Sequence, residues 1–331
     1  MNENLETFRP TFWARNPHLQ TVFASLKLRA AGMNRMSACA REMTIDAGDG
    51  VRLIGFFSQH PEGESRGLIL MIHGWEGSSQ STYMLCTGRY LFRKGYDIFR
   101  LNMRDHGDSH HLNEGLFHGA LIEEVFHAAA EVSFLSVDKP FTIIGFSLGG
   151  NFALRIARKC TSSEIPGLKR VIAVSPVLDP HKATIAIDRG PSIYRNYFLK
   201  KWKTSLRKKQ SLFPGKYDFG HMLQAETCME LTDLIIPVYS PFADSREYFR
   251  EYTLLGNVFS DLEVPVLIMT ARDDPFIDPA DFYDLDGNEH LRISIQRYGG
   301  HCGFLDPFPF GCWSDRRIYD ILNNRINGER S

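Results

Sequence analysis

The chain has 331 residues, of which 43% are hydrophobic, and its formal net charge at pH 7 is −1. This length and apolar content can bury a large core, and one α/β domain with an insertion is the simplest organisation. The near-neutral charge gives no sign of a nucleic-acid partner. The six cysteines lack the spacing of a metal site or a redox pair, which favours a reducing compartment.

The start of the chain carries no targeting signal that we can identify. Residues 1–6 contain neither the basic nor the apolar segment of a secretory leader. No apolar run approaches the ~18 residues that a transmembrane helix needs. We therefore expect a cytoplasmic protein, with peripheral membrane contact left open. Residues 1–40 are predicted to form a helical extension that packs on the core.

Short apolar and β-branched runs alternate with helical patterns along the rest of the chain, which predicts a mostly parallel, twisted sheet with helices on both faces. The core is assigned to residues 41–177 and 264–331. Its strands are predicted near 42–47, 51–58, 67–72, 96–102, 141–144, 171–174, 264–270 and 291–295.

Residues 178–263 are too many for a crossover between two parallel strands, which about a dozen residues can close. The surplus predicts a helical lid. Four apolar residues recur at helical spacing within it, and six basic residues surround them. The basic residues are interpreted either as a solvated face or as a contact with an anionic membrane. The apolar set is Tyr194, Phe198, Trp202 and Leu206, and the basic set is Lys200, Lys201, Lys203, Arg207, Lys208 and Lys209.

The pentapeptide Gly145-Phe146-Ser147-Leu148-Gly149 lies between a predicted strand and a predicted helix over Asn151–Lys159. A serine on such a sharp bend projects its hydroxyl above the sheet. The flanking glycines avoid collisions with the neighbouring strand and helix. We predict that Ser147 is a nucleophile, and a structural turn serine is the alternative.

An acid and a histidine follow in the order Ser147, Asp274, His301, which is the order of the α/β-hydrolase triad. The histidine would take the serine proton, and the carboxylate would hold the imidazole in the useful tautomer. Asp274 is favoured over its neighbour Asp273. Asp179 also follows a predicted strand, but it is interpreted as a turn residue.

The predicted third strand is followed by residues 73–77, which have the sequence His-Gly-Trp-Glu-Gly. In this arrangement the backbone N–H groups of Trp75 and Leu148 would form the oxyanion hole. The Trp75 ring and Phe146 are candidates for lining the substrate pocket, and packing under the lid is the alternative for the Trp75 ring. His73 is expected to shape the loop.

No metal or organic cofactor is expected. His110, His111 and His118 lie close in sequence, but no acidic or cysteine residue accompanies them at ligand spacing. They are interpreted as loop residues.

Together the His-Gly loop, the serine pentapeptide, the Asp-Asp-Pro turn and the Gly-Gly-His segment resemble the α/β-hydrolase superfamily. The N-terminal Phe8-Arg9-Pro10 and Asn16-Pro17-His18-Leu19-Gln20-Thr21 resemble the opening of the YheT-like (embryogenesis-associated) hydrolases. That resemblance implies a serine esterase or lipase that acts on carboxylic esters, including acylglycerols and phospholipids.

One segment departs from this family pattern. Many relatives have Arg-Gly-x-Gly after the fourth strand, whereas this chain has Arg104-Asp105-His106-Gly107. If the second position requires a positive φ, Asp tolerates it better than most residues but less well than Gly.

The predicted function is hydrolysis of a small-molecule or lipid ester through an acyl-enzyme. An acyltransferase would use the same intermediate and differ only in its acceptor. A non-catalytic lipid-binding or scaffold protein on the same fold is the alternative from another class.

Overall fold

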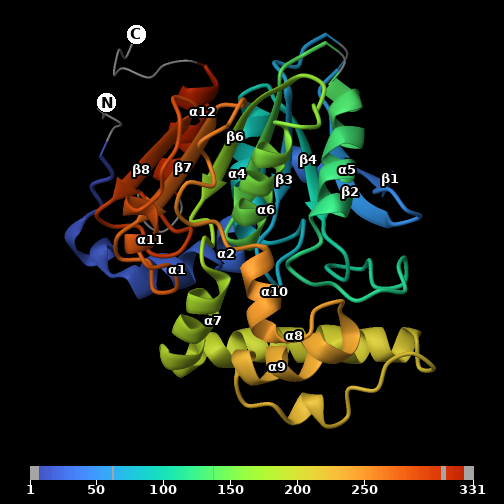
Figure 1. Cartoon of the computed structure of the whole chain (residues 1–331). Coiled ribbons are helices and arrows are strands. Elements are labelled where there is room, and N and C mark those ends of the chain that lie inside the picture. Colours follow the sequence, from blue (N-terminus) through green and yellow to red (C-terminus); the bar gives the residue numbers. More distant parts are fainter. Residues whose placement is uncertain (1–6, 62, 137, 307–310, 324–331) are drawn as a thin grey trace.

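The computed structural model describes residues 7–306 and 311–323, apart from 62 and 137. Eight strands form one sheet in the order β1-β2-β4-β3-β5-β6-β7-β8 (Figure 1). β1 and β2 are antiparallel to their neighbours, and the pairs from β4 to β8 are parallel. The predicted fold class is confirmed. The strands are β1 (Arg41–Asp46), β2 (Arg52–Ser58), β3 (Leu68–Ile72), β4 (Asp97–Asn102), β5 (Phe141–Phe146), β6 (Leu168–Val174), β7 (Val266–Ala271) and β8 (Leu291–Gln296).

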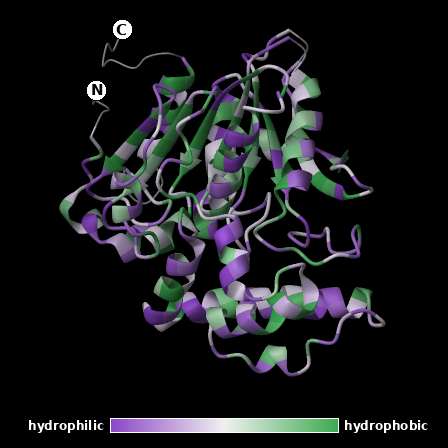
Figure 2. Ribbon diagram, in the orientation of Figure 1, coloured by the Kyte–Doolittle hydropathy of each residue, from purple (hydrophilic) through white to green (hydrophobic). Residues whose placement is uncertain are grey.

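Helices cover both faces of the sheet because the central strands are apolar on both sides. In β3, Leu70 belongs to the core cluster that includes α5 (Ile122–Ser133) and α6 (Leu148–Lys159). The next residue, Met71, belongs to the cluster with α4 (Thr82–Arg93) and α12 (Trp313–Leu322). Figure 2 shows these strands as the most hydrophobic part of the molecule. Each fully buried apolar side chain of this kind stabilises the fold by about 1.5–3 kcal/mol.

The N-terminal extension lies across the sheet edge beside α4 (Figure 1). The side chain of Asn16 caps its longest helix by accepting the N–H groups of His18 and Leu19. Phe8 is buried against the rings of Phe304 and Trp313. Residues 1–6, on which the prediction about a targeting signal depends, lie outside the described residues. The elements are η1 (Phe12–Arg15), α1 (Pro17–Ala24), α2 (Lys27–Ala30) and α3 (Arg35–Ala38).

The insertion forms a helical layer across the carboxyl edge of the sheet, and we call it the cap (Figure 1). Its longest helix presents the predicted apolar stripe to the core. Tyr194 and Leu206 are buried, and Phe198 and Trp202 are half-buried against the core cluster. The cap consists of α7 (Pro180–Arg189), α8 (Ser192–Leu212), η3 (Met222–Gln224), α9 (Cys228–Tyr239) and α10 (Ser245–Glu251).

The basic residues of α8 do not all face outward, so neither the solvated-face nor the membrane-contact interpretation holds for Lys209. Lys209 is fully buried, and its Nζ lies 2.7 Å from Asp105 Oδ1 and 2.6 Å from the carbonyl oxygen of Asn113. Asp105 has φ +57°, so the segment that departs from the family pattern adopts the left-handed conformation. The carboxylate at this position then provides the partner for a lysine of the cap.

Within the described ranges, no helix combines the length and the apolar character needed to cross a membrane.

Candidate active site

Ser147 lies at the sharp turn between β5 and α6, with φ +54° and ψ −118°. A non-glycine residue in this region of φ/ψ space is strained and persists only when its surroundings hold it. A Cβ at Gly145 would lie 2.1 Å from the carbonyl oxygen of Gly149, and one at Gly149 would lie 2.3 Å from that of Ile72. Strand and helix are therefore too close for any side chain at these two positions. The N–H of Ser147 donates to the carbonyl of Val174 at 2.9 Å, which fixes the turn.

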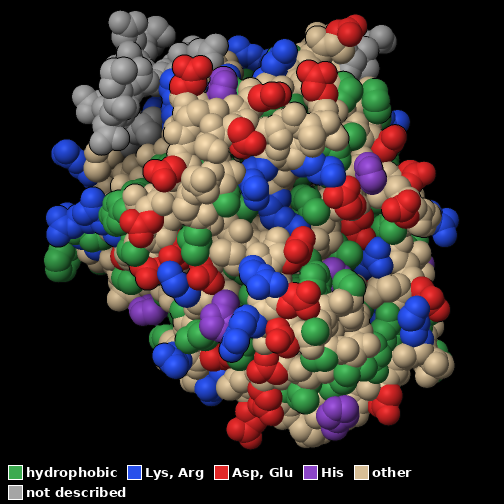
Figure 3. Space-filling model, in the orientation of Figure 1, with side chains coloured by type: hydrophobic (Ala, Val, Ile, Leu, Met, Phe, Trp, Pro, Cys, Tyr) green, Lys and Arg blue, Asp and Glu red, His purple; other side chains and the backbone are tan. Residues whose placement is uncertain are grey.

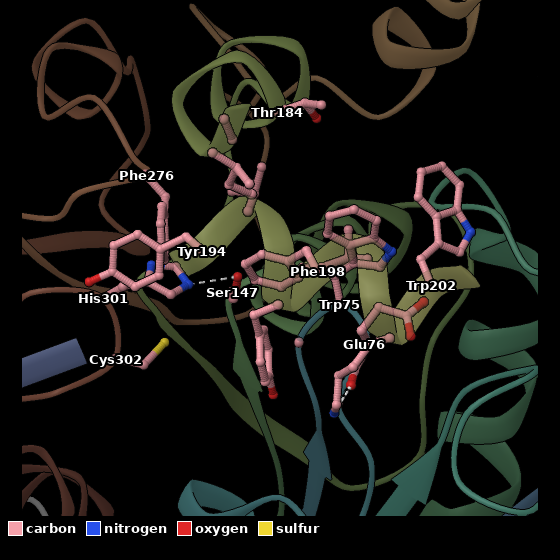
Figure 4. Close-up of a pocket in the computed structure, with 18 of the residues that line it drawn as sticks. Trp75, Glu76, Ser147, Thr184, Tyr194, Phe198, Trp202, Phe276, His301 and Cys302 are labelled. Atoms are coloured by element: carbon pink, nitrogen blue, oxygen red, sulfur yellow. Dashed lines mark hydrogen bonds between the residues drawn. The ribbon is translucent and has the colours of Figure 1, made fainter. Parts of the chain in front are cut away.

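Three predicted residues meet above this turn. His301 Nε2 lies 2.9 Å from Ser147 Oγ (Figure 4). On its other side, His301 Nδ1 lies 2.8 Å from Asp274 Oδ2. The second oxygen of Asp274 accepts the N–H groups of Phe276 and Ile277 at 2.9 and 3.2 Å. The carboxylate is thereby held in the orientation that meets the imidazole.

The other two acidic candidates have different positions. Asp273 Oδ1 accepts the N–H of Gly300 at 2.9 Å. This residue therefore supports the segment after β8 that carries His301, residues 297–306, which we call the histidine loop. Asp179 caps α7 by accepting the N–H of Lys182.

The surroundings of His301 favour its protonated form. Burial lowers the pKa of the imidazole, but the Asp274 carboxylate and Cys302 outweigh it and hold the pKa well above its ordinary value. The same negative charge that raises the pKa stabilises an imidazolium formed during a reaction. The ring accepts a serine proton only while it is unprotonated, so this environment is suited to alkaline conditions.

The segment after β3 runs beside the serine. A Cβ at Gly74 would lie 3.1 Å from Ser147 Cβ. The N–H of Gly74 donates to the hydroxyl of Tyr83 at 2.9 Å, and that of Trp75 comes next. Leu148 is the first residue of α6, where N–H groups have no intrahelical acceptor. Within the described part of the chain, neither Trp75 nor Leu148 uses its N–H on a protein acceptor.

A cavity of about 740 Å³ opens beside Ser147 and extends under the cap. Its lining on the cap side is mostly apolar, with Ile187, Ile235, Ile236, Tyr248 and Phe249 among the residues. Such a size and lining suit an organic ligand with an apolar part.

Trp75 lines the cavity as predicted, whereas Phe146 does not. The Trp75 ring stacks on Phe198 with centroids 5.0 Å apart and meets Trp202 edge-on at 5.3 Å (Figure 4). Phe146 is buried on the opposite face of the sheet against Tyr83, at 5.0 Å. Alternation along β5 places its side chain on that face, so the prediction that Phe146 lines the pocket is wrong.

His73 is buried beneath the loop it was expected to shape. Its Nδ1 lies 2.8 Å from the carbonyl oxygen of Gly74, and its Nε2 accepts the N–H of Met103 at 3.2 Å. Burial and the neighbouring His106 lower the pKa of His73 well below its ordinary value.

Two residues of the cavity, Glu76 and Lys201, make a contact that was not predicted from the sequence. The backbone carbonyl of Glu76 accepts from Lys201 Nζ at 2.6 Å, which links residues 73–77, the predicted oxyanion loop, to the cap. Burial raises the pKa of the Glu76 carboxyl to about 8, although Lys201 opposes this shift. No local sequence signal could have indicated this pair, because 125 positions separate the two residues.

The N-terminal segment that marked the family resemblance contacts the histidine loop. Thr21 Oγ1 accepts the N–H of His301 at 2.9 Å and donates to the carbonyl of Pro17 at 2.7 Å. Gln20 is fully buried. Its Oε1 accepts the N–H of Leu305, and its Nε2 donates to the carbonyl of Ala14, both at 2.7 Å. The motif carries the resemblance to the YheT-like hydrolases, but its sequence did not indicate this contact.

The described residues contain no group of three or more His, Cys, Asp or Glu side chains that could hold a metal ion. His110 Nε2 lies 2.8 Å from Ser205 Oγ, and the ring of His118 packs edge-on against Phe242. Burial lowers the pKa of His110 to about 3 and that of His118 to about 4.

Comparisons with known proteins agree with this architecture. The family model described as alpha/beta hydrolase fold matches residues 67–307. The chain is 23% identical to YheT of Escherichia coli K12, over 97% of this chain and 94% of that protein. It is also 23% identical to human Phospholipase ABHD3, over 95% of this chain and 76% of that protein.

Solved structures show the same fold. The Pyrococcus furiosus esterase Pf2001 superposes with a TM-score of 0.54 at 14% identity, covering 89% of this chain and 96% of that one. A membrane phospholipase A described as a bacterial virulence factor gives a TM-score of 0.55 at 15% identity, covering 93% and 92%. The chain therefore belongs to the alpha/beta hydrolase fold family and is similar over almost its whole length to YheT.

Proposed function

We propose that this protein is a serine hydrolase of carboxylic esters that works through an acyl-enzyme. The observation that carries the proposal is the continuous chain of hydrogen-bond distances from Ser147 Oγ through the His301 ring to Asp274, beside a large, partly apolar cavity. The names of related proteins, which include a phospholipase and an esterase, support ester hydrolysis as the reaction class.

In each step of the proposed reaction, covalent bonds form or break and His301 accepts or returns one proton. Ser147 Oγ attacks the ester carbonyl carbon while His301 Nε2 takes the serine proton. The N–H groups of Trp75 and Leu148 donate to the resulting oxyanion. His301 returns the proton to the leaving alcohol as the carbon–oxygen bond breaks, which leaves an acyl-serine. Water then attacks this acyl group with His301 as base, and the acid product leaves as the serine regains its proton.

The acyl chain is proposed to lie against the apolar lining of the cavity, under the cap. This placement suits lipid esters such as phospholipids or acylglycerols, and no protein group other than the residues named needs to take part in the chemistry. Thr184 lies on the cap side of the cavity and is half-buried, so a larger side chain can extend into that space (Figure 4).

The central test is Ser147→Ala. The substitution removes only one hydroxyl, and the precedent of triad serines is a loss of up to ~10⁶ in kcat. Turnover of p-nitrophenyl esters and labelling by a fluorophosphonate probe would both be measured on folded protein. Activity within tenfold of the wild type would overturn the proposal.

The acyl site has its own test. Thr184→Phe should lower kcat/KM for long-chain p-nitrophenyl esters by about tenfold and leave acetate or butyrate esters nearly unchanged, because one to two methylene positions are worth about 1–3 kcal/mol. Thr184→Val is the matched control. A uniform loss across all chain lengths would contradict the placement of the acyl chain.

A further inference from the structure

The opening of the cavity is formed by the N-terminal extension on one side and the first turns of α8 on the other. Val22, Ile193 and Tyr197 all line the cavity and are nevertheless 38%, 62% and 50% exposed. A residue that both lines a cavity and remains exposed lies at its mouth. The rim therefore carries apolar side chains on both sides, and the cavity lining also includes the exposed polar residues Ser25, Lys27, Gln80 and Lys201.

The exposed apolar surface continues from this rim along the extension. Leu19 on α1 is 39% exposed and Leu28 on α2 is 68% exposed. A contiguous patch of exposed apolar side chains marks an interaction site, whereas single scattered apolar residues are normal on a protein surface.

Charge is distributed unevenly around the same opening. Residues 7–41 contain six Lys or Arg and no Asp or Glu, and α8 contains seven Lys or Arg and no Asp or Glu. By contrast, residues 218–251 of the cap contain seven acidic and two basic residues. Figure 3 shows acidic side chains along the part of the surface where α9 lies. A chain of net charge −1 thus has an excess of positive charge on the two elements that form the opening and an excess of negative charge on residues 218–251 of the cap.

Two lysines on the elements that form this opening have no carboxylate partner in the described part of the chain, and one of them, Lys27, also lines the cavity. Lys27 and Lys200 are exposed, and no carboxylate among the described residues pairs with either. They differ in this respect from Lys208 and Lys209, which form ion pairs with Asp108 and Asp105.

We propose that the mouth face docks on an anionic lipid bilayer, and we define that face as Leu19, Val22, Lys27, Leu28, Ile193, Tyr197 and Lys200. Apolar side chains can enter the headgroup boundary while the lysines meet lipid phosphates. A lipid ester could then enter the cavity without crossing water. The use of this contact rests on the proposed function, but the binding itself does not.

The test measures binding to phosphatidylcholine vesicles with and without ~30% phosphatidylglycerol. The Ser147→Ala protein is used so that lipid turnover does not enter the measurement. We expect Lys27→Gln/Lys200→Gln to weaken binding to anionic vesicles about 30-fold, the effect of two lysines near a lipid surface. Leu19→Ser/Leu28→Ser/Ile193→Ser should weaken it at least tenfold. Raising the salt should weaken wild-type binding, because the Debye length shortens.

Matched controls replace similar residues elsewhere. Phe134→Ser and Val238→Ser remove side chains that are 64% and 60% exposed on η2 (Phe134–Ser136) and α9, and Arg246→Gln/Arg250→Gln removes two charges from α10. The controls should bind vesicles as the wild type does. Equal binding by the mouth-face variants, or equal losses in the controls, would overturn the proposal even if ester hydrolysis holds.

A second inference comes from the histidine loop, whose backbone is strained and is fixed by contacts with the N-terminal extension. Cys302 and Phe304 have φ of +55° and +49°, in a region that non-glycine residues rarely adopt. The loop also approaches α1 closely, since a Cβ at Gly300 would lie 2.4 Å from the carbonyl oxygen of Pro17. Such a conformation persists only when neighbouring groups fix it.

We infer that Thr21 is a positioning residue for His301. Its hydroxyl is the acceptor for the His301 N–H and is itself fixed by donation to Pro17. Loss of that acceptor would let the histidine backbone shift, and a misplacement of about 1 Å at a reacting group can cost ~10²-fold in rate. This inference also rests on the proposed function.

Thr21→Val keeps the shape and removes the hydroxyl. We expect kcat to fall about tenfold with KM within twofold, and Thr21→Ser to restore kcat. Ser58→Ala is the matched control, since Ser58 Oγ donates to the carbonyl of Met36 at 2.7 Å and ties the extension to β2 away from His301. That control should lower stability and leave kcat unchanged. Full activity in Thr21→Val, with Ser147→Ala inactive, would refute the positioning role and spare the proposed function.

Discussion

The N-terminal extension and the cap both lie outside the α/β core, and each contacts a different half of the candidate site. The extension holds the histidine loop through Thr21 and Gln20. The cap holds the oxyanion loop, because Lys201 donates to the carbonyl of Glu76 and Phe198 stacks on Trp75. The core supplies the strained turn that carries Ser147. The extension fixes the loop that carries His301, and the cap fixes the loop of residues 73–77.

The extension and the cap are attached to the core by different kinds of interaction. The extension uses neutral, buried hydrogen bonds from consecutive residues of a short motif. The cap uses aromatic stacking and the buried pair of Lys209 and Asp105. Burial lowers the pKa of Lys209 and raises that of Asp105, so desolvation opposes the charged forms of both partners. Such a pair specifies where the cap sits more than it stabilises the fold, but removing one partner is costly.

The largest loss of kcat should come from a substitution in the core, and the losses expected from substitutions in the extension and the cap are compared with it. Asp274→Asn should lower kcat by about 10³–10⁴, because the wrong histidine tautomer is favoured. It should also move the acid limb of the pH–kcat profile to lower pH, because removing the carboxylate charge lowers the pKa of His301. Asp273→Asn, which weakens the contact to the N–H of Gly300 and leaves the His301 ring contact in place, should lower kcat by about tenfold. The reverse ranking would transfer the acid role to Asp273.

The attachment of the cap is tested by Lys209→Met. The substitution leaves the Asp105 carboxylate buried without its partner, and we expect the free energy of unfolding to fall by about 3–5 kcal/mol. Urea denaturation would measure it. Lys208→Met is the control, because its partner Asp108 is fully exposed and such pairs are worth about 0–1 kcal/mol. Similar stability of the two variants would show that the buried pair does not anchor the cap.

The contact between the cap and the oxyanion loop is tested by Lys201→Met, with Lys200→Met as control. Loss of one charge-assisted hydrogen bond from an exposed lysine should lower kcat by about three- to tenfold. This is the counterpart of Thr21→Val on the other side of the site. If Lys201→Met leaves kcat unchanged while Thr21→Val lowers it, only the extension supports catalysis.

The smallest expected effect concerns pH. The Glu76 carboxyl, with a pKa of about 8, is neutral below that pH and negative above it. A negative charge in the cavity opposes an oxyanion, so we expect kcat to fall a few-fold above pH about 8. Glu76→Gln should remove this alkaline fall and leave the acid limb, which reports His301, in place. An unchanged alkaline limb in Glu76→Gln would exclude Glu76 as its source.

Much of the fold follows from local sequence patterns. Each of the eight strands lies within a few residues of its predicted position, because apolar and β-branched runs bounded by turn residues specify a buried strand locally. The turn at Ser147 was predictable for the same reason, since glycine spacing between a strand and a helix leaves few conformations. Parallel strands bring their carboxyl ends to one edge, so the order of Ser147, Asp274 and His301 was enough to expect them together.

What the sequence could not determine depends on contacts between distant segments. Choosing between Asp273 and Asp274 requires the direction of one turn, in which two backbone N–H groups orient Asp274. Phe146 was misplaced because the face to which a strand residue points is fixed by the register of the whole sheet.

The same limit applies to the two additions. Thr21 and His301 are 280 positions apart, and Lys209 and Asp105 are 104 apart. From the sequence, Thr21 is known only to carry a hydroxyl, and Lys209 only to carry a charge. Tertiary packing decides that the hydroxyl fixes a histidine and that the charge is buried, because burial removes water and leaves each group dependent on the single partner the fold brings to it.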